Sequence, residues 1–311
     1  HTEMTRPFRG SASVTHPLLS EAVTQFQAQA YKELLPSQGP VRTRVLGMED
    51  NEKVNQAQRV QDFMNYMITE EMEEYTPEFD QLLFYLPLAG SAFKKIYYDA
   101  LMERAVSKFI PAEDLVVPYF ATDLKDAPRI THVLKQSEND LLKKMATGFY
   151  REVELMKPEK KENKIQDKYN ELEGVKPVET NDYIYNVLEM HVDLDLSDYI
   201  AENEEDKINI KIPYIVTIEE STRKVLSIYR NYKPEDTKFT RREYFSHYKF
   251  LPGLGFYGFG LIHMIGGLSR TATSALRQLL DAGTLSNLPA GFKQRGVRVK
   301  DDAANIQPGE F

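Results

Sequence analysis

The sequence contains no cysteine among its 311 residues. Disulfides and thiolate metal sites are therefore excluded, and a reducing compartment is the simplest setting for the protein. The chain also lacks a run of roughly 18 to 20 apolar residues, the length that spans a bilayer. Its first residues do not follow the basic-then-apolar pattern of a signal peptide. We therefore expect a soluble protein that assembles in the cytosol without contacting a membrane.

Motifs for catalysis are equally scarce. Gly-x-Ser-x-Gly and Walker A elements are missing, and no two histidines have the spacing of metal ligands. One motif does match: residues 253–258 read Gly-Leu-Gly-Phe-Tyr-Gly, the G-x-G-x-x-G fingerprint of dinucleotide-binding proteins, with Asp281 about twenty residues later. The fingerprint requires a βαβ unit, whereas here a long helical pattern runs into Pro289. We favour a glycine-rich corner and expect no catalytic residue, cofactor or metal; a nucleotide-dependent enzyme is the alternative.

Two charged stretches are interpreted as solvated. Residues 151–182 are densely charged and offer few apolar anchors, which predicts a solvated helix or a mobile excursion. From Asp193 to Glu204, oxygen-bearing side chains recur at the spacing of a calcium loop, but Asp198 stands where the sharp turn needs glycine. An acidic loop is therefore favoured over a calcium site.

The net charge of −8 opposes strong binding to nucleic acid, because phosphate contacts need Lys and Arg. The charge is unevenly distributed. From Gly260 onward there are six basic and four acidic residues, which leaves 33 basic and 43 acidic residues in the rest of the chain. The C-terminal part is mildly basic and the body is acidic.

Apolar periodicity predicts a mixed α and β body. We expect helices at residues 17–34, 51–67, 77–86 and 141–145, the last preceded by a capping box formed by Ser137 and Asp140. Strands are expected at residues 93–98, 115–119, 129–134, 183–194, 208–218, 225–232 and 245–251, with a short alternating stretch at 41–46. A hairpin turn at 219–222 joins two of these strands.

Residues 260–288 predict a helix about 40 Å long. Its packing face holds Leu261, Ile265, Leu268, Ala272 and Leu279. The opposite face holds Arg270, Ser274, Arg277 and Asp281, of which the last two are spaced for a local ion pair. We expect the apolar face to pack against adjacent structure and the polar face to stay in water. Because the chain offers no second helix of this length, copies of the helix arranged around a ring are one way to bury the apolar face.

The segment that begins this helix resembles a known family. The stretch Gly255-Phe256-Tyr257-Gly258-Phe259-Gly260-Leu261-Ile262-His263, continued by Gly266-Gly267-Leu268 and Ala282-Gly283-Thr284, is similar to the start of the stem helix of tailed-phage portal proteins. Residues 288–292 and 306–311 resemble the family's passage into the clip, and residues 111–118 resemble a strand motif of its wing.

The resemblance implies an α+β portal-type subunit. Residues 1–259 would form the wing, with the charged excursion at about 151–182; residues 260–288 would form the stem helix, and residues 289–311 the start of the clip. The chain begins at His1 and stops at Phe311. We therefore expect it to be truncated before the second stem helix, the tunnel loop and the crown of the family.

The resemblance also implies a function. Portal subunits form a ring, here expected to be a dodecamer, at one vertex of the virion capsid after assembly in the host cytoplasm. The ring passes double-stranded DNA during packaging and ejection. It contacts the major capsid protein and scaffold, docks the terminase, and later docks tail or adaptor proteins, without catalysis of its own. Another head–tail adaptor ring protein is the second alternative.

The family's geometry places two further groups of residues. The polar face of the stem, Arg270, Ser274, Arg277 and Asp281, would meet the tunnel or a neighbouring subunit. Four basic residues would lie close to the clip: Lys293, Arg295, Arg298 and Lys300.

Overall fold

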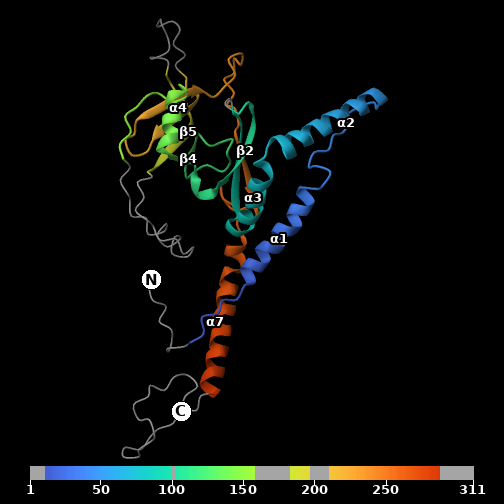
Figure 1. Ribbon diagram of the computed structural model, residues 1–311, viewed down its shortest axis with the longest axis vertical. Helices are drawn as coiled ribbons and strands as arrows, with labels where there is room; N and C mark the ends of the chain where they lie inside the picture. The colour runs from blue at the N-terminus through green and yellow to red at the C-terminus, as the bar shows by residue number, and fades with distance from the viewer. Residues whose placement is uncertain (1–10, 100–101, 158–182, 197–209, 288–311) are drawn as a thin grey trace, which may run out of the picture.

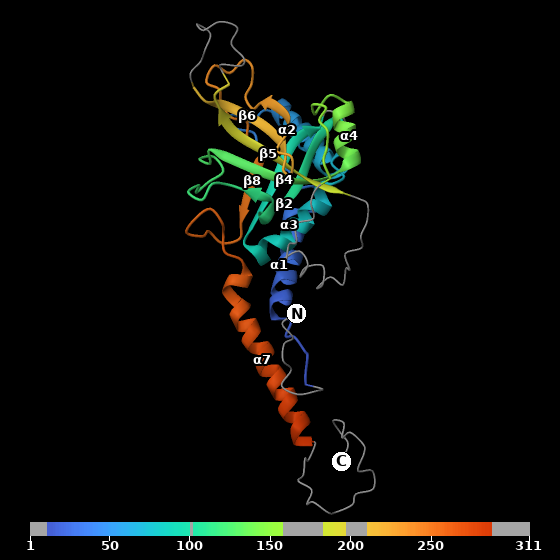
Figure 2. The same ribbon diagram turned by 90° about the vertical axis from the view of Figure 1, so that its left-hand side faces the viewer.

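The computed structural model describes residues 11–99, 102–157, 183–196 and 210–287. Two antiparallel sheets and the helices around them form a body, and helix α7 (Leu261–Asn287) projects from it as a stalk (Figures 1 and 2). The α+β class expected from the sequence is thus confirmed. No helix in the described ranges is both long and apolar enough to cross a membrane.

The first third of the chain is helical, as expected. It forms α1 (Leu18–Leu34), α2 (Asn51–Tyr66), a π-helical turn (Met67–Glu71) and α3 (Tyr75–Ala89). Helix α3 ends at Gly90, whose φ of +91° is accessible to glycine at little cost. The alternating stretch at 41–46 forms no strand. Its backbone instead lies against α2, where the Val41 amide donates to Asn65 and the Thr43 hydroxyl donates to the Ala57 carbonyl.

The smaller sheet has the order β2-β1-β8 and is antiparallel throughout. It contains β1 (Ser91–Asp99), β2 (Arg104–Pro111) and β8 (Phe245–Lys249). The predictions for β1 and β8 are confirmed, whereas β2 was not expected. Its Val106 and Ile110 are buried, but Ser107 and Lys108 between them weaken the apolar pattern of the segment.

The larger sheet has five antiparallel strands in the order β3-β4-β5-β6-β7. Its strands are β3 (Leu115–Val116), β4 (Arg129–Ser137), β5 (Ile184–Leu194), β6 (Ile212–Glu219) and β7 (Val225–Arg230). The expected hairpin joins β6 to β7. Strand β3 is shorter than expected because Pro118 cannot donate to a ladder, and its carbonyl accepts instead from Ala121 in a turn. After β4, Ser137 caps α4 (Glu138–Ala146) by accepting from the Asp140 amide, as the capping box predicted.

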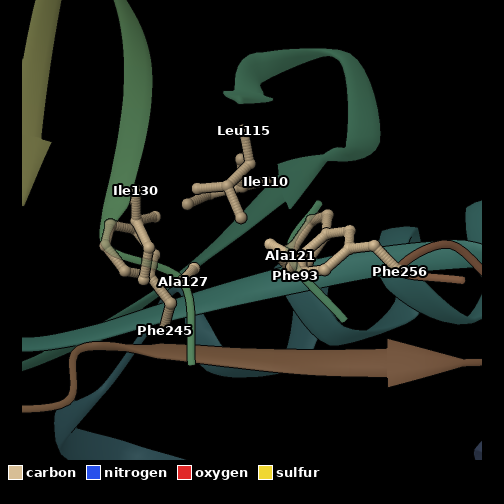
Figure 3. Packing of buried hydrophobic residues seen from close by; sticks show 8 residues of the cluster. All are labelled: Phe93, Ile110, Leu115, Ala121, Ala127, Ile130, Phe245 and Phe256. Carbon is tan, nitrogen blue, oxygen red and sulfur yellow. The ribbon is translucent and has the colours of Figure 1, made fainter. Parts of the chain in front are cut away.

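A single apolar cluster holds the two sheets together. It draws Phe93 from β1, Ile130 from β4 and Phe245 from β8 into one core (Figure 3). Phe256, in the corner that precedes α7, stacks on Phe93 with ring centroids 5.8 Å apart. Burying a phenylalanine stabilises a fold by roughly 1.5–3 kcal/mol. The base of α7 is therefore anchored in the same core as both sheets.

Part of the expected charged excursion can be placed. Residues 151–157 form no helix or strand, and the Arg151 amide donates to the Leu226 carbonyl at 2.7 Å. The rest of that prediction, residues 158–182, lies outside the described residues, as do residues 288–311.

Candidate functional site

The glycine-rich corner fixes where α7 leaves the body. A Cβ on Gly258 would lie 2.6 Å from the carbonyl oxygens of Gly90 and Leu251, and a Cβ on Gly260 would lie 2.4 Å from that of Leu88. Real Cβ atoms do not approach that closely, so the corner packs backbone against backbone at the end of α3. Gly255 differs, because a Cβ there would meet nothing within 4 Å. Gly253 is also constrained, because a Cβ there would lie 2.1 Å from the Tyr257 carbonyl oxygen. The corner therefore depends on Gly253, Gly258 and Gly260, but not on Gly255.

The same corner does not have the context of a dinucleotide site. Strand β8, which precedes the motif, pairs with antiparallel β1, and α7 leads to no parallel strand in the described residues. Two amides at the end of the motif are also engaged: Gly258 donates to Ser91 Oγ at 2.8 Å, and Phe259 donates to the Leu251 carbonyl at 2.9 Å. A phosphate site needs such amides to point at the ligand. The geometry therefore argues against the nucleotide-dependent alternative.

One side of α7 is apolar, uncharged and exposed. Leu268 and Leu279, two residues of the expected packing face, are 62% and 70% exposed, and Met264 lies on the same side. The other three residues of that face, Leu261, Ile265 and Ala272, are half-buried. The face is therefore covered only in part by its own chain, where α1 and α3 lie beside α7.

The opposite side of α7 is covered by the N-terminal segment, residues 11–16. The Asp281 carboxylate accepts from the Ala12 amide at 2.6 Å, and the Thr273 hydroxyl accepts from the His16 amide at 3.1 Å. The Arg277 guanidinium donates to the Val14 carbonyl at 2.7 Å. The expectation that this stripe stays in water is wrong for Arg277 and Asp281, because both bind backbone groups of residues 11–16. Arg270 and Ser274 are exposed.

The basic residues expected near the clip, Lys293, Arg295, Arg298 and Lys300, lie outside the described residues.

A buried polar cluster, which the sequence did not reveal, joins the two sheets. Lys95 on β1 reaches Glu189 on β5 with 2.6 Å and 2.7 Å between Nζ and the carboxylate oxygens. His191 Nε2 lies 2.8 Å from the same carboxylate. Burial alone would raise the pKa of Glu189, but the hydrogen bond with His191 and the charge of Lys95 outweigh it and hold the pKa well below its usual range. The carboxylate is therefore ionised and pairs with Lys95 across the junction.

Histidines around this cluster are neutral at physiological pH. Burial is the main cause that lowers the pKa of His132 to about 4, and the nearby Lys95 charge adds to it. Burial also lowers the pKa of His191, although Glu189 opposes the shift. A cavity of about 370 Å³ lies beside them, with His191, Arg241 and His247 in its wall. Arg241 donates to the carbonyls of Leu124, Lys125 and Ala127, so its guanidinium holds the neighbouring loop.

Ser91 and His247 resemble a nucleophile and its base, with 3.2 Å between Ser91 Oγ and His247 Nε2. Ser91 is only 2% exposed, and its Oγ already accepts from the Gly258 amide. Burial is the main cause that lowers the pKa of His247 to about 4. A substrate cannot reach this oxygen in the observed arrangement. The pair instead ties the corner at Gly258 to β1 and β8.

No family model matches the sequence, and no curated protein is significantly similar to it.

Proposed function

We propose that this protein is a ring-forming portal subunit of a tailed phage, which passes double-stranded DNA and does not catalyse a reaction. The observation that carries the proposal is α7: 27 residues of helix that project from the body and leave an uncharged apolar face exposed. An exposed apolar helix face of this kind marks a surface that another protein surface buries. Copies of the same chain around a ring supply that surface.

The resemblance of residues 255–268 to the start of a portal stem supports the same proposal, and it coincides with α7 and its corner. The glycines that the resemblance shares at 258 and 260 lie where the backbone of α3 approaches most closely. A role in orienting α7 accounts for them without a ligand. In this proposal the ring lies at one capsid vertex, contacts the major capsid protein and scaffold, and docks terminase first and tail or adaptor proteins afterwards.

Electron microscopy of the purified protein, together with native mass spectrometry, tests the proposal. We expect top views with a central opening and a mass that corresponds to about twelve copies, the number that the family resemblance implies. A protein that is monomeric at every concentration and salt condition would contradict it. Saturable binding of ATP or NAD would favour the nucleotide-dependent enzyme, and a ring that binds only assembled heads would favour the adaptor.

A further inference from the structure

The outer surface of residues 13–15 and the exposed side of α7 both lack charged side chains. Ser13, Val14 and Thr15 are exposed, small and uncharged. The exposed side of α7 presents Met264, Leu268 and Leu279, with small residues such as Ala275 between them and no charged side chain. Two such surfaces pack closely without burying an unpaired charge.

These two surfaces also lie on opposite sides of the helix. At about 100° of rotation per residue, the positions that hold the N-terminal segment, Thr273, Arg277 and Asp281, centre about 160° from Leu261. The exposed apolar positions Met264, Ala275 and Leu279 centre about 165° further round, nearly opposite. In a ring closed by rotation, each subunit meets its two neighbours through two different surfaces, one on each side. The exposed apolar side of α7 and the N-terminal segment on its opposite side are two such surfaces.

We infer that, in the ring proposed above, the uncharged face of α7 packs against residues 11–16 of the next copy. The inference rests on the proposed ring. It assigns to Arg277 and Asp281 a positioning role. They bind backbone groups of Ala12, Ser13 and Val14, and Arg277 also donates to the Thr15 hydroxyl, which turns that side chain toward α7. Ser13 and Val14 are thereby presented to the neighbour. The inference also excludes a contact between two apolar faces of α7, which a twofold dimer would make.

The absence of native cysteine makes disulfide cross-linking a direct test. Val14 lies at the height of Arg277, so in a ring it faces the neighbour's α7 near residues 275–279. The test protein carries Val14→Cys with Leu279→Cys. Within one copy this pair cannot join, because α7 lies between the two positions and a disulfide needs Cα atoms within about 7 Å. The matched control is Val14→Cys with Leu254→Cys, since Leu254 is exposed but lies in the corner above α7.

After mild oxidation, we expect a ladder of covalent multimers on a non-reducing gel for the test pair and none for the control. If rings form under reducing conditions but the test pair gives no ladder, the inference is overturned and the proposed ring still stands. Cross-linking by Leu279→Cys alone would also overturn it, because that result requires two apolar faces to meet. If the unmodified protein forms no ring, the proposed function fails, and the inference fails with it.

A second measurement separates positioning from bulk stability. Arg277→Ala should increase hydrogen exchange in residues 11–16 and weaken assembly by at least tenfold, with an unchanged melting temperature. Arg270→Ala, on the same helix but exposed, should change neither exchange nor assembly. Equal assembly by the two variants would contradict the positioning role.

Discussion

Replacing Leu268 by Asp separates the surface role of α7 from its role in the fold. Leu268 is 62% exposed in the single chain, so the change should leave the subunit folded. Complete burial of a leucine contributes roughly 1.5–3 kcal/mol, and about 1–2 kcal/mol of this is still available to a neighbour. The aspartate loses that contribution and adds the cost of burying an unpaired charge, about 2–3 kcal/mol even after partial hydration. Together these terms weaken each subunit contact by about 4 kcal/mol, close to a thousandfold.

Sedimentation velocity over a range of concentrations measures this shift, and thermal unfolding of the same samples reports on the fold. Leu268→Ala, which loses apolar area without adding charge, should weaken assembly by about tenfold. Arg270→Ala should leave assembly unchanged because its side chain is exposed outside both proposed contacts. Intact rings for Leu268→Asp would refute the reasoning. So would a melting temperature lower by many degrees, since that result would place the side chain inside the subunit.

The remaining predictions concern the body. Gly258→Ala should lower the free energy of unfolding by more than about 2 kcal/mol because its Cβ meets two carbonyl oxygens at 2.6 Å, while Gly255→Ala should change it by less than about 0.5 kcal/mol. Lys94→Met should raise the free energy of unfolding by about 1–3 kcal/mol, as measured by chemical denaturation at pH 7. The reason is that the Lys94 ammonium is buried over the Tyr75 and Phe79 rings without a hydrogen bond, and this burial lowers its pKa to about 8. The pKa of His132 is about 4 in the folded protein and 6.5 in the unfolded chain. Its contribution to stability is therefore fully present above pH 6.5 and is lost as the pH falls toward 4, because the unfolded chain takes up the proton first. His132→Phe should therefore flatten the fall in melting temperature across that window, and an unchanged slope would contradict the assignment.

The elements that the sequence predicted are those with strong local signals. Helix α7 has apolar residues at helical spacing, and α4 has a serine and an aspartate at the spacing of a capping box. Both signals lie within the element itself. Strand β2 was missed because its buried Ser107 and exposed Lys108 are polar and break the apolar alternation, and what makes it a strand is its pairing with residues 92–99 of β1.

The contacts that define the candidate site could not be predicted in the same way. The periodicity of α7 showed that Arg277 and Asp281 lie on one face, but not that the chain's own N-terminal segment covers it from more than 260 positions away. The junction of the sheets poses a similar problem. Alternation along β5 places Glu189 and His191 on one side of a strand, yet Lys95, which neutralises the carboxylate, is 94 positions earlier. Long-range pairs of this kind leave no periodic trace in a single sequence.

The distribution of charge on α7 bears on how a ring of this protein would treat DNA. Arg277 is hydrogen-bonded to backbone carbonyls of residues 11–16, and Asp281 binds an amide there, so neither is placed primarily to meet phosphate. Arg270 is exposed and points away from the apolar face. Each phosphate that a protein neutralises adds about 0.9 to the slope of log affinity against log salt. If Arg270 supplied the phosphate contacts of α7, Arg270→Ala would remove the contribution of this helix to the salt dependence of DNA affinity. Arg277→Ala would instead weaken assembly of the ring. A wall with few exposed cations and an acidic body behind it would hold DNA weakly, and weak contacts are what a conduit for a moving polyanion requires.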